Sequence, residues 1–400
     1  MTTIIREFRK GPGIIISTVM WEFFSIFGLR ALLIFYLTQK LGFTDISADR
    51  LYAGYISLIW ISPLIGGWIA DRYLGFKNSV ILGSLLIVLG HIIISMPIDY
   101  ALYAGLSCLI CGIGFFKTNA ICLVGSFYQD QPQKLTSIMT LYYVGANIGA
   151  TLAPAVCAYL QQRYGYQAAF VAAAVGMLLG LLTLFFYRDR LKGVGEKPIS
   201  PVSSVKLGGV ISAGFVVAVF GLCLVLKYNL IAYVLWPTLL LALIKVISLT
   251  ASMSVSSKRR LVGLLCLTLL GTAFWILDQQ AGSSISLFIS RNVMRNGIPA
   301  GAFQSINPFM IIVGGIVVAS YFAAKDTKMQ SRMLLVRVVL GIFLLTLGYA
   351  FISASASYAA QFGLVSMWPV AIGLAVMGLA ELFIDPVILA GIGQVVPLSA

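Results

Sequence analysis

Long apolar runs alternate with short polar segments along the whole chain. Twelve runs are long enough to cross a bilayer, which takes about 20 residues each, and they lie near 13–38, 52–70, 79–97, 101–128, 135–160, 167–187, 208–227, 229–250, 261–289, 302–324, 334–354 and 364–396. Because a bilayer interior offers the backbone no hydrogen-bond partners, each run is predicted to be helical. The pattern predicts an all-α, polytopic membrane protein.

Composition agrees with this class. Hydrophobic residues make up 60% of the 400 positions and charged residues 10%, far from the balance of a water-soluble domain. The first apolar run is followed by no small-residue cleavage pattern, so we expect it to stay as a helix. All six cysteines lie in apolar runs without the spacing of a metal site, and we expect neither a metal nor a cofactor.

The net charge of +14 is unevenly distributed among the loops. If the amino terminus is cytoplasmic, most Lys and Arg residues fall on its side, among them Arg72, Lys77 and Arg188. Fewer, such as Lys40 and Arg163, fall on the opposite side. The positive-inside rule then predicts that both termini are cytoplasmic. A nucleic-acid surface would need a basic soluble domain, and the sequence contains none.

A change in composition after the sixth apolar run divides the chain. The segment "RDRLKGVGEKPISPVSSVKL" is charged and then rich in Gly, Pro and Ser, as is typical of a linker. The two runs after it are almost wholly apolar. We therefore expect a six-helix bundle at 1–187, a cytoplasmic linker at 188–207, an inserted hydrophobic hairpin at 208–256 and a C-terminal bundle at 257–400.

Short motifs within and between the runs resemble those of a known family. The loop "GGWIADRYLGFKNSV", with Gly67, Asp71, Arg72 and Gly75, resembles the cytoplasmic loop motif of the major facilitator superfamily. Five further segments occur in the order of the fourth, fifth, seventh, eighth and tenth helix motifs of the proton-dependent oligopeptide transporters: "GIGFFKTNAICLVGSFY", "YYVGANIGA", "FWILDQQAGSSISLF", "FQSINPFMI" and "AELFIDPVILAGIGQVVP". The chain is identified on these motifs as a divergent bacterial member of that family.

The resemblance implies a major facilitator fold with two extra helices between its halves. Such a fold has six helices in each half, yet only four runs follow the predicted hairpin. We therefore expect 1–400 to be an incomplete form of a longer transporter that lacks its last two helices. The rival interpretation is that 208–250 supplies two core helices and the second half is complete.

Ionisable residues inside the apolar runs mark the candidate site. Placing a charged side chain at the centre of the membrane costs roughly 2.5–3.5 kcal/mol, so each of these residues is first interpreted as part of a functional site. Arg30 could instead neutralise Glu22 two turns away. His91 has no acid one turn away and is interpreted as a packed neutral imidazole. The set of buried ionisable candidates is Glu22, Arg30, Lys117, Asp278, Glu381 and Asp385.

A dipeptide is a zwitterion whose ends lie about 7 Å apart when extended. One buried cation and one buried anion could bind both ends, with Lys117 facing the carboxylate and Glu381 the ammonium. Pro386 disfavours helical geometry at Asp385, so we expect a broken or bent helix there. The expected substrate-binding residues are Lys117, Asn147, Glu381, Trp60, Trp275 and Gln280, and the expected proton-coupling residues are Glu22, Asp278 and Asp385.

Several departures from the family motifs leave more than one function open. The first helix has Val19 and Phe23 where the family has an acid and an Arg, and the acid of the seventh helix aligns with Gln279. Proton-coupled symport of di- and tripeptides is the leading hypothesis. The alternatives are facilitator transport of another small solute, such as an amino acid, a drug or a siderophore, and peptide sensing without transport. We expect no enzyme, no nucleic-acid partner, and a monomer in the bacterial cytoplasmic (inner) membrane.

Overall fold

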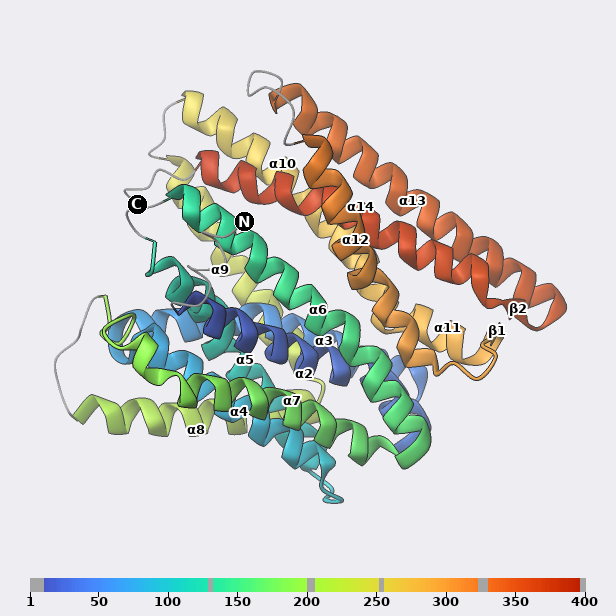
Figure 1. The fold of residues 1–400 in the computed structure, drawn as a ribbon, viewed down its shortest axis with the longest axis horizontal. Helices are drawn as coiled ribbons and strands as arrows, with labels where there is room; N and C mark the ends of the chain where they lie inside the picture. The colour runs from blue at the N-terminus through green and yellow to red at the C-terminus, as the bar shows by residue number, and fades with distance from the viewer. Residues whose placement is uncertain (1–10, 129–131, 200–205, 252–254, 323–329, 396–400) are drawn as a thin grey trace. The chain divides into compact units, whose positions relative to one another are not determined.

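The computed structural model describes residues 11–128, 132–199, 206–251, 255–322 and 330–395 (Figure 1). In these ranges the secondary structure is helical apart from one pair of two-residue strands. The chain divides into two compact units, Met1–Leu230 and Ile231–Ala400. Each unit is described on its own below.

The first unit contains the helices of the first seven apolar runs. They are α2 (Pro12–Phe35), the π-helical turn η1 (Tyr36–Lys40), α3 (Asp45–Ile69), the π-helical turn η2 (Ala70–Leu74), α4 (Phe76–Ser95), α5 (Ala101–Gly125), α6 (Pro132–Tyr164), α7 (Tyr166–Phe186), the 3₁₀ turn η3 (Arg188–Leu191) and α8 (Lys206–Lys227).

The second unit contains the remaining helices and both strands. They are α9 (Ile231–Ala251), α10 (Val255–Asp278), the 3₁₀ turn η4 (Gln279–Gly282), α11 (Ser284–Asn292), β1 (Val293–Met294), the 3₁₀ turn η5 (Ala300–Ser305), α12 (Ile306–Phe322), α13 (Gln330–Phe362), β2 (Val365–Ser366) and α14 (Met367–Val395).

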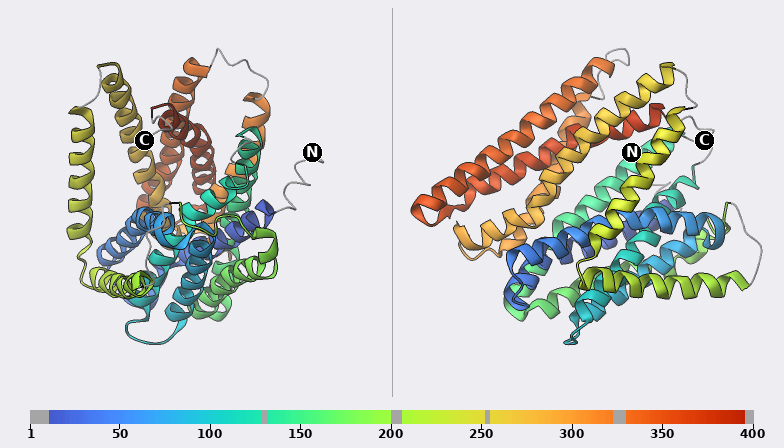
Figure 2. Two further views of the ribbon diagram at one scale, coloured as in Figure 1. Left: turned by 90° about the vertical axis from the view of Figure 1, so that its left-hand side faces the viewer. Right: turned by 180° about the vertical axis from the view of Figure 1, so that it is seen from behind.

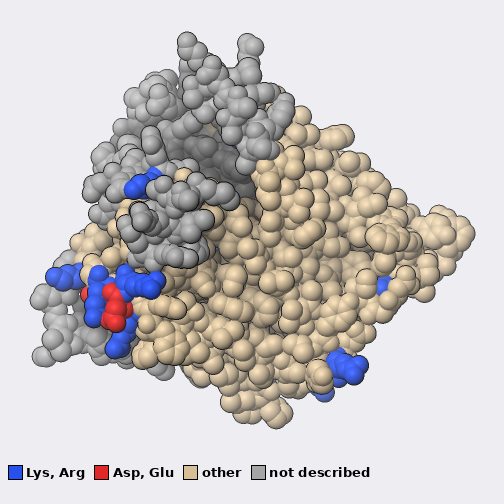
Figure 3. Space-filling view, in the orientation of Figure 1, with Lys and Arg blue, Asp and Glu red and all other residues tan. Residues whose placement is uncertain are grey.

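The helices have the length and polarity of membrane spans. Within the described ranges, eleven helices are long and apolar enough to cross a bilayer, and the described part of α8 adds a shorter apolar helix at Val217–Lys227. On the face drawn in Figure 3, charged side chains gather at few places and other residues cover the remaining described surface. The prediction of an all-α, polytopic membrane protein is confirmed.

In the first unit, α4 and α5 cross at paired glycines. A Cβ atom added to Gly83 would lie 2.6 Å from the carbonyl oxygen of Gly112, and one added to Gly90 would lie 2.8 Å from that of Gly105. Side chains at these positions would force the two backbones apart. The two helices therefore pack backbone against backbone, as small residues allow in membrane bundles.

The crossing of α3 and α5 also depends on a glycine. A Cβ atom at Gly66 would overlap the backbone of Gly114, whereas one at Gly67 would meet only the Cγ2 atom of Thr118, at 3.8 Å. Of the two adjacent glycines in this motif, Gly66 is therefore the one at the close approach of the two helices. This crossing brings α3 close to Lys117, which follows Gly114 on α5.

Helix α8 packs on the outside of α5 and α3. The ring of Phe215 lies 5.5 Å from that of Phe115, and Val219 and Leu222 pack on the same small cluster. No residue of the most apolar window of α9, Ile231–Ser248, is buried within the protein. The division between the two units falls between α8 and α9, and the predicted boundaries at 188–207 and 208–256 stay predictions.

In the second unit, α14 is the central helix, because α10, α12 and α13 all pack on it. Figure 2 shows α13 and α14 running along each other. Their seam contains Gly348 and Gly373, and a Cβ atom on either would lie within 3 Å of the other's carbonyl oxygen. Strands β1 and β2 form a short parallel pair that joins the end of α11 to the loop after α13.

The break in this unit lies elsewhere than predicted. Helix α14 continues through Pro386, as transmembrane helices can when neighbouring helices support the freed backbone. The run 261–289 instead breaks after Asp278, where η4 separates α10 from α11. Polar groups satisfy the backbone there, because the Oγ atom of Ser286 donates to the carbonyl of Ala281 at 2.7 Å and the amide of Ser283 donates to that of Gln280 at 3.2 Å.

Candidate functional site

Lys117 is held on α5 against an aromatic side chain of α3. Its Nζ atom lies 3.6 Å from the centroid of the Trp60 ring, close enough for a cation–π interaction. Lys117 is half-buried, whereas 53% of Trp60 is exposed. The ammonium group is thus held by an aromatic side chain that other groups can still approach.

Glu22 of α2 belongs to the same cluster. Its side chain is 1% exposed, and it interacts electrostatically with Lys117, Tyr55 and Tyr142. The glutamate expected for proton coupling and the lysine expected for carboxylate binding therefore lie within electrostatic reach of each other. The four residues come from α2, α3, α5 and α6.

Arg30 is connected to this cluster through tyrosines. Its Nε atom donates to the hydroxyl of Tyr52 at 3.2 Å, and its guanidinium group lies 5.2 Å from the centroid of the Phe27 ring. Arg30 and Glu22 both interact electrostatically with Tyr55. Tyr55 is fully buried, and within the described residues its hydroxyl has no hydrogen-bond partner.

Asn147 and His91 make hydrogen bonds inside the first unit. The Nδ2 atom of Asn147 donates to the carbonyl of Tyr143 on the same helix, at 2.9 Å, and the side chain is 7% exposed. The Nε2 atom of His91 lies 2.6 Å from the Oγ atom of Ser25, and His91 is fully buried. This environment agrees with the interpretation of His91 as a packed imidazole.

Among the described side chains of the second unit, two acids are buried, Asp278 and Glu381, which are 5% and 8% exposed. The Nδ2 atom of Asn307 on α12 donates to the Oδ1 atom of Asp278 at 3.2 Å. Next to it, the hydroxyl of Tyr349 donates to the carbonyl of Leu277 at 2.6 Å. Asp278, the last residue of α10, is therefore attached to α12 by its own side chain and to α13 by its neighbour.

Glu381 lies on α14, close to the helix that carries Asn307. A Cβ atom added to Gly378, one turn before Glu381, would lie 2.6 Å from the backbone oxygen of Asn307. This close approach of α12 and α14 connects the surroundings of both acids. The side chain of Asp385, the third acid expected here, lies outside the described residues.

The remaining candidates of this unit surround η4. The Oε1 atom of Gln280 accepts a hydrogen bond from the Oγ atom of Ser284 at 2.5 Å. The ring of Trp275 stands edge-on to that of Phe274, at a centroid distance of 5.7 Å. The Oε1 atom of Gln279, the residue that aligns with the family's acid, is buried without a partner among the described residues.

The loop between α3 and α4 is fastened to the segment that follows α7. The guanidinium group of Arg72 lies 4.8 Å from the centroid of the Trp68 ring, and Gly75 has a φ angle of +73°. The amide of Lys77 donates to the carbonyl of Gly195 at 2.9 Å, and its Nζ atom lies 2.7 Å from the Oε1 atom of Glu196.

Sequence reasoning missed four residues of the two clusters. Tyr55 and Tyr142 lie beside Glu22, and Asn307 and Tyr349 lie beside Asp278. Asn307 is the Asn of the "FQSINPFMI" segment, so its motif was a usable signal. Tyrosines are frequent in the apolar runs of this chain. Only the packing of the helices shows that Tyr55, Tyr142 and Tyr349 lie beside the acids.

An apolar helical bundle that holds a cation and an acid within electrostatic reach of each other is typical of membrane transporters. The fold is that of the major facilitator superfamily as the peptide transporters have it. The family model described as "POT family" matches residues 77–399. The chain therefore belongs to the proton-dependent oligopeptide transporter (POT) family.

Curated relatives and solved structures agree with this assignment. The dipeptide and tripeptide permease A of Cronobacter turicensis is 28% identical over 393 residues, which cover 96% of this chain and 78% of the relative. The permease of the same name from Chromobacterium violaceum is 27% identical over 391 residues, with coverages of 96% and 78%.

Two solved structures show how far the likeness extends. The crystal structure of peptide transporter POT with sulfate superposes with a TM-score of 0.84 at 26% identity and covers 98% of this chain and 83% of its own. The crystal structure of tetrameric PepTSo2 superposes with a TM-score of 0.76 at 26% identity and covers 98% of this chain and 91% of its own. The chain is a multi-pass transporter and not an enzyme.

Proposed function

We propose that this protein is a secondary active transporter that couples the uptake of di- and tripeptides to the entry of protons by alternating access. The observation that carries the proposal is the ammonium of Lys117, placed over Trp60 and within electrostatic reach of Glu22. A cation held in this way can exchange its partner. It pairs with Glu22 when the site is empty and with a peptide carboxylate when the site is loaded.

Each unit contributes polar groups suited to one part of a peptide. In the first unit, Lys117 binds the carboxylate, Asn147 a backbone amide, and Trp60 is a wall for varied side chains. In the second unit, Glu381 binds the ammonium, Gln280 a backbone amide, and Trp275 is a second aromatic wall. Asn147 and Glu381 are buried polar side chains within apolar helices, and such residues commonly mark substrate pathways in membrane proteins.

Proton coupling is assigned to the buried acids. When a peptide carboxylate takes Lys117, Glu22 loses its cation, and binding a proton then removes its uncompensated charge. Asp278, held by Asn307, is the second proposed proton carrier, and Asp385 the third. The acid of the family's seventh helix aligns with Gln279. In this chain the proton-coupling role would therefore fall on the neighbouring residue, Asp278.

The names of relatives support this substrate class. Two curated relatives are dipeptide and tripeptide permeases, and one solved relative was crystallised with 5-aminolevulinic acid, also a small zwitterion. We further propose that the protein lies in the bacterial cytoplasmic membrane with both termini in the cytoplasm. We propose a monomer, and because a relative is described as tetrameric, the mass of the detergent-solubilised protein tests this directly.

Uptake by proteoliposomes tests the function. Purified protein would be reconstituted with an imposed inward proton gradient, and accumulation of labelled dialanine would be followed over time. We expect accumulation above the equilibrium level, and its collapse when a proton ionophore is added. Uptake that stops at the equilibrium level would indicate facilitated diffusion. Peptide binding without any flux would indicate a peptide sensor. Flux of amino acids or drugs in place of peptides would establish the alternative substrate class.

A further inference from the structure

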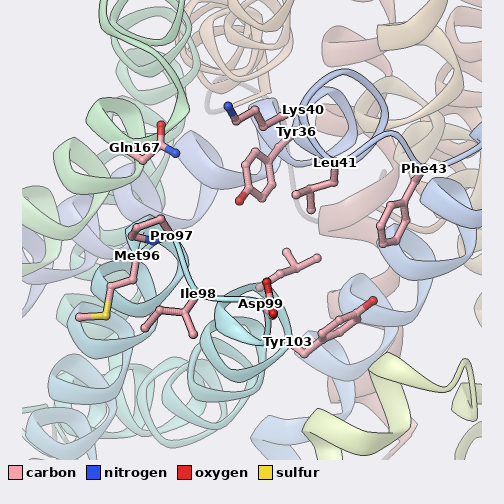
Figure 4. A pocket seen from close by; sticks show the side chains of 11 residues that line it. Tyr36, Lys40, Leu41, Phe43, Met96, Pro97, Ile98, Asp99, Tyr103 and Gln167 are labelled. Carbon is pink, nitrogen blue, oxygen red and sulfur yellow. The ribbon is translucent and has the colours of Figure 1, made fainter.

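A cavity of about 400 Å³ opens in the first unit, and its lining does not include Lys117 (Figure 4). Its walls come from η1 and the loop after it, the turn between α4 and α5, and the first residues of α7. Small-molecule sites are typically about 300–1,000 Å³ in volume and combine apolar walls with a few polar groups. The lining of this cavity fits that description, with Leu41, Phe43, Met96, Ile98 and Leu102 among the apolar residues and Tyr36, Lys40, Asp99, Tyr103 and Gln167 as the polar ones.

The walls of the cavity are held in place before any ligand binds. On one side, the amides of Leu41 and Phe43 donate to the carbonyls of Tyr36 and Leu37 at 3.0 and 2.9 Å. On the other side, the amide of Ile98 donates to the carbonyl of Met96 at 2.9 Å. Such loops lose little freedom when a ligand arrives, so more of the contact energy contributes to affinity.

Aromatic packing fixes the floor of the cavity. The Tyr36 ring lies 5.3 Å from the Tyr166 ring and 5.1 Å from the Phe170 ring. The hydroxyl of Tyr166 donates to the Oε1 atom of Gln39 at 3.0 Å, which ties α7 to η1. The hydroxyl end of Tyr36 is directed into the cavity in Figure 4.

One cation and one acid line this cavity. Lys40 ends η1, and Asp99 lies in the turn between α4 and α5, so the two charges sit on different walls (Figure 4). Neither forms an ion pair with any described residue. Both are exposed at the mouth of the cavity, and the amide of Gln167 lies on the side toward Lys40.

We propose that this cavity is a second binding site, for a small zwitterion whose anionic group binds Lys40 and whose ammonium binds Asp99. The hydroxyl of Tyr36 adds a hydrogen bond to the ligand, and the apolar walls take its carbon skeleton. Two sources supply this chemistry, a free short peptide or amino acid and the ethanolamine headgroup of a phospholipid. The proposal does not depend on transport, because it concerns binding at residues apart from the Lys117 cluster.

Protection of a cysteine from alkylation tests the proposal. Gln167→Cys places a thiol in the lining of the cavity, and Arg50→Cys places one at an exposed position outside it. The purified full chain in detergent would be labelled with a polar maleimide in the presence of dialanine, N-acetyl-dialanine, dialanine amide or glycerophosphoethanolamine. We expect dialanine to slow labelling at position 167 several-fold, the two singly blocked peptides to have little effect, and position 50 to be unaffected. Protection by glycerophosphoethanolamine alone would assign the site to the lipid headgroup.

Second variants separate this site from the central one. Adding Lys40→Gln or Asp99→Asn to Gln167→Cys should abolish protection, whereas adding Lys117→Gln should leave it intact. The proposal is overturned if no zwitterion protects the thiol, or if protection survives both Lys40→Gln and Asp99→Asn. It is also overturned if protection disappears only with Lys117→Gln, because the effect would then be transmitted from the central site. Transport of dialanine in the same variants reports on the proposed function independently.

Discussion

The ammonium of Lys117 lies 3.6 Å from the centroid of the Trp60 ring, with the buried carboxyl group of Glu22 within its electrostatic reach. In the proposed function, Glu22 competes with a substrate carboxylate for this cation, whereas Trp60 can stay in contact with it. An aromatic ring stabilises the ammonium without neutralising it. The lysine can therefore stay charged between the departure of one anion and the arrival of the next.

Replacing Lys117 should remove peptide binding. Truncating one partner of a desolvated charge pair costs about 2–5 kcal/mol, so Lys117→Gln should weaken dialanine binding by roughly 30-fold or more. Binding would be measured by isothermal titration of the purified protein. Lys245→Gln, at an exposed position of α9, is the matched control and should bind normally. Wild-type affinity in Lys117→Gln would rule out the proposed carboxylate site.

Replacing the aromatic partner should have a smaller and graded effect. A cation–π contact contributes about 0.5–2 kcal/mol, so Trp60→Leu should weaken binding by roughly 2- to 30-fold, and Trp60→Phe by less. The same titration measures both variants. Equal affinities for Trp60→Leu and Trp60→Phe would mean that the ring acts only by its bulk.

Glu22→Gln should separate substrate movement from proton movement. Exchange of labelled for unlabelled dialanine across the membrane needs no net proton transfer, so it should persist in this variant. Accumulation driven by an imposed proton gradient should be lost, because the neutral amide cannot release a proton. Both activities would be measured on the same proteoliposomes. Gradient-driven accumulation at the wild-type level would exclude Glu22 as the coupling group.

The hydrogen bond between Asn307 and Asp278 gives a further prediction. Hydrogen bonds to charged groups contribute about 1.5–3 kcal/mol, so Asn307→Ala should impair gradient-driven uptake in the same direction as Asp278→Asn, though less severely. Ser284→Ala removes only the contact with Gln280 and serves as the control. If Asp278→Asn left gradient-driven uptake unchanged, Asp278 would be a structural acid.

The contact between Lys77 and Glu196 should give a pH-dependent stability. The hydrogen bond from Lys77, then a backbone amide at Gly193 and the charge of Lys77, hold the pKa of Glu196 below its usual value of 4.5. Its contribution is therefore fully present above pH 4.5 and is lost as the pH falls through the lowered pKa. Melting temperatures of the wild type and Glu196→Gln should differ slightly at pH 7 and converge as the pH falls below 4.5 and through the lowered pKa. A constant difference across this range would contradict the prediction.

Gly75 tests the same contact through the backbone. Its φ angle is +73°, and an added Cβ atom would lie 2.6 Å from the backbone oxygen of Glu196. Strained backbone of this kind costs about 1–3 kcal/mol. Gly193 also has a positive φ angle, +78°, but an added Cβ atom there would meet no atom within 4 Å. Gly193→Ala therefore measures the backbone strain alone, without the steric overlap. Gly75→Ala should lower the melting temperature further than Gly193→Ala does.

The sequence predicted the helices and the family because both depend on local features. Apolar runs set the spans, and ordered motifs such as the one around Lys117 set the family. The pairing of Lys117 with Trp60 was not predicted, although both residues were expected in the site, because it depends on how α3 and α5 are rotated against each other. For the same reason the motif alone did not show which of its two adjacent glycines, Gly66 or Gly67, lies at the helix crossing.

The break in the second unit shows the limits of local rules more clearly. A broken or bent helix was expected at Pro386, but α14 is continuous there, and the helix of the run 261–289 breaks after Asp278. A proline removes one backbone hydrogen bond, and transmembrane helices can tolerate this loss. At η4, hydrogen bonds from Ser283 and Ser286 satisfy the backbone, and composition alone does not reveal such contacts.

The glycine seam between α4 and α5 suggests how Lys117, the proposed carboxylate-binding residue, can be observed. Because Gly83 and Gly90 bring the backbones of α4 and α5 into close contact, we expect the two helices to move as one packed pair. A movement of the α5 backbone around Lys117 during a transport cycle should then carry α4 along with it. A fluorophore or spin label on an outward-facing residue of α4, such as Leu85, would report the motion of Lys117 without touching the site.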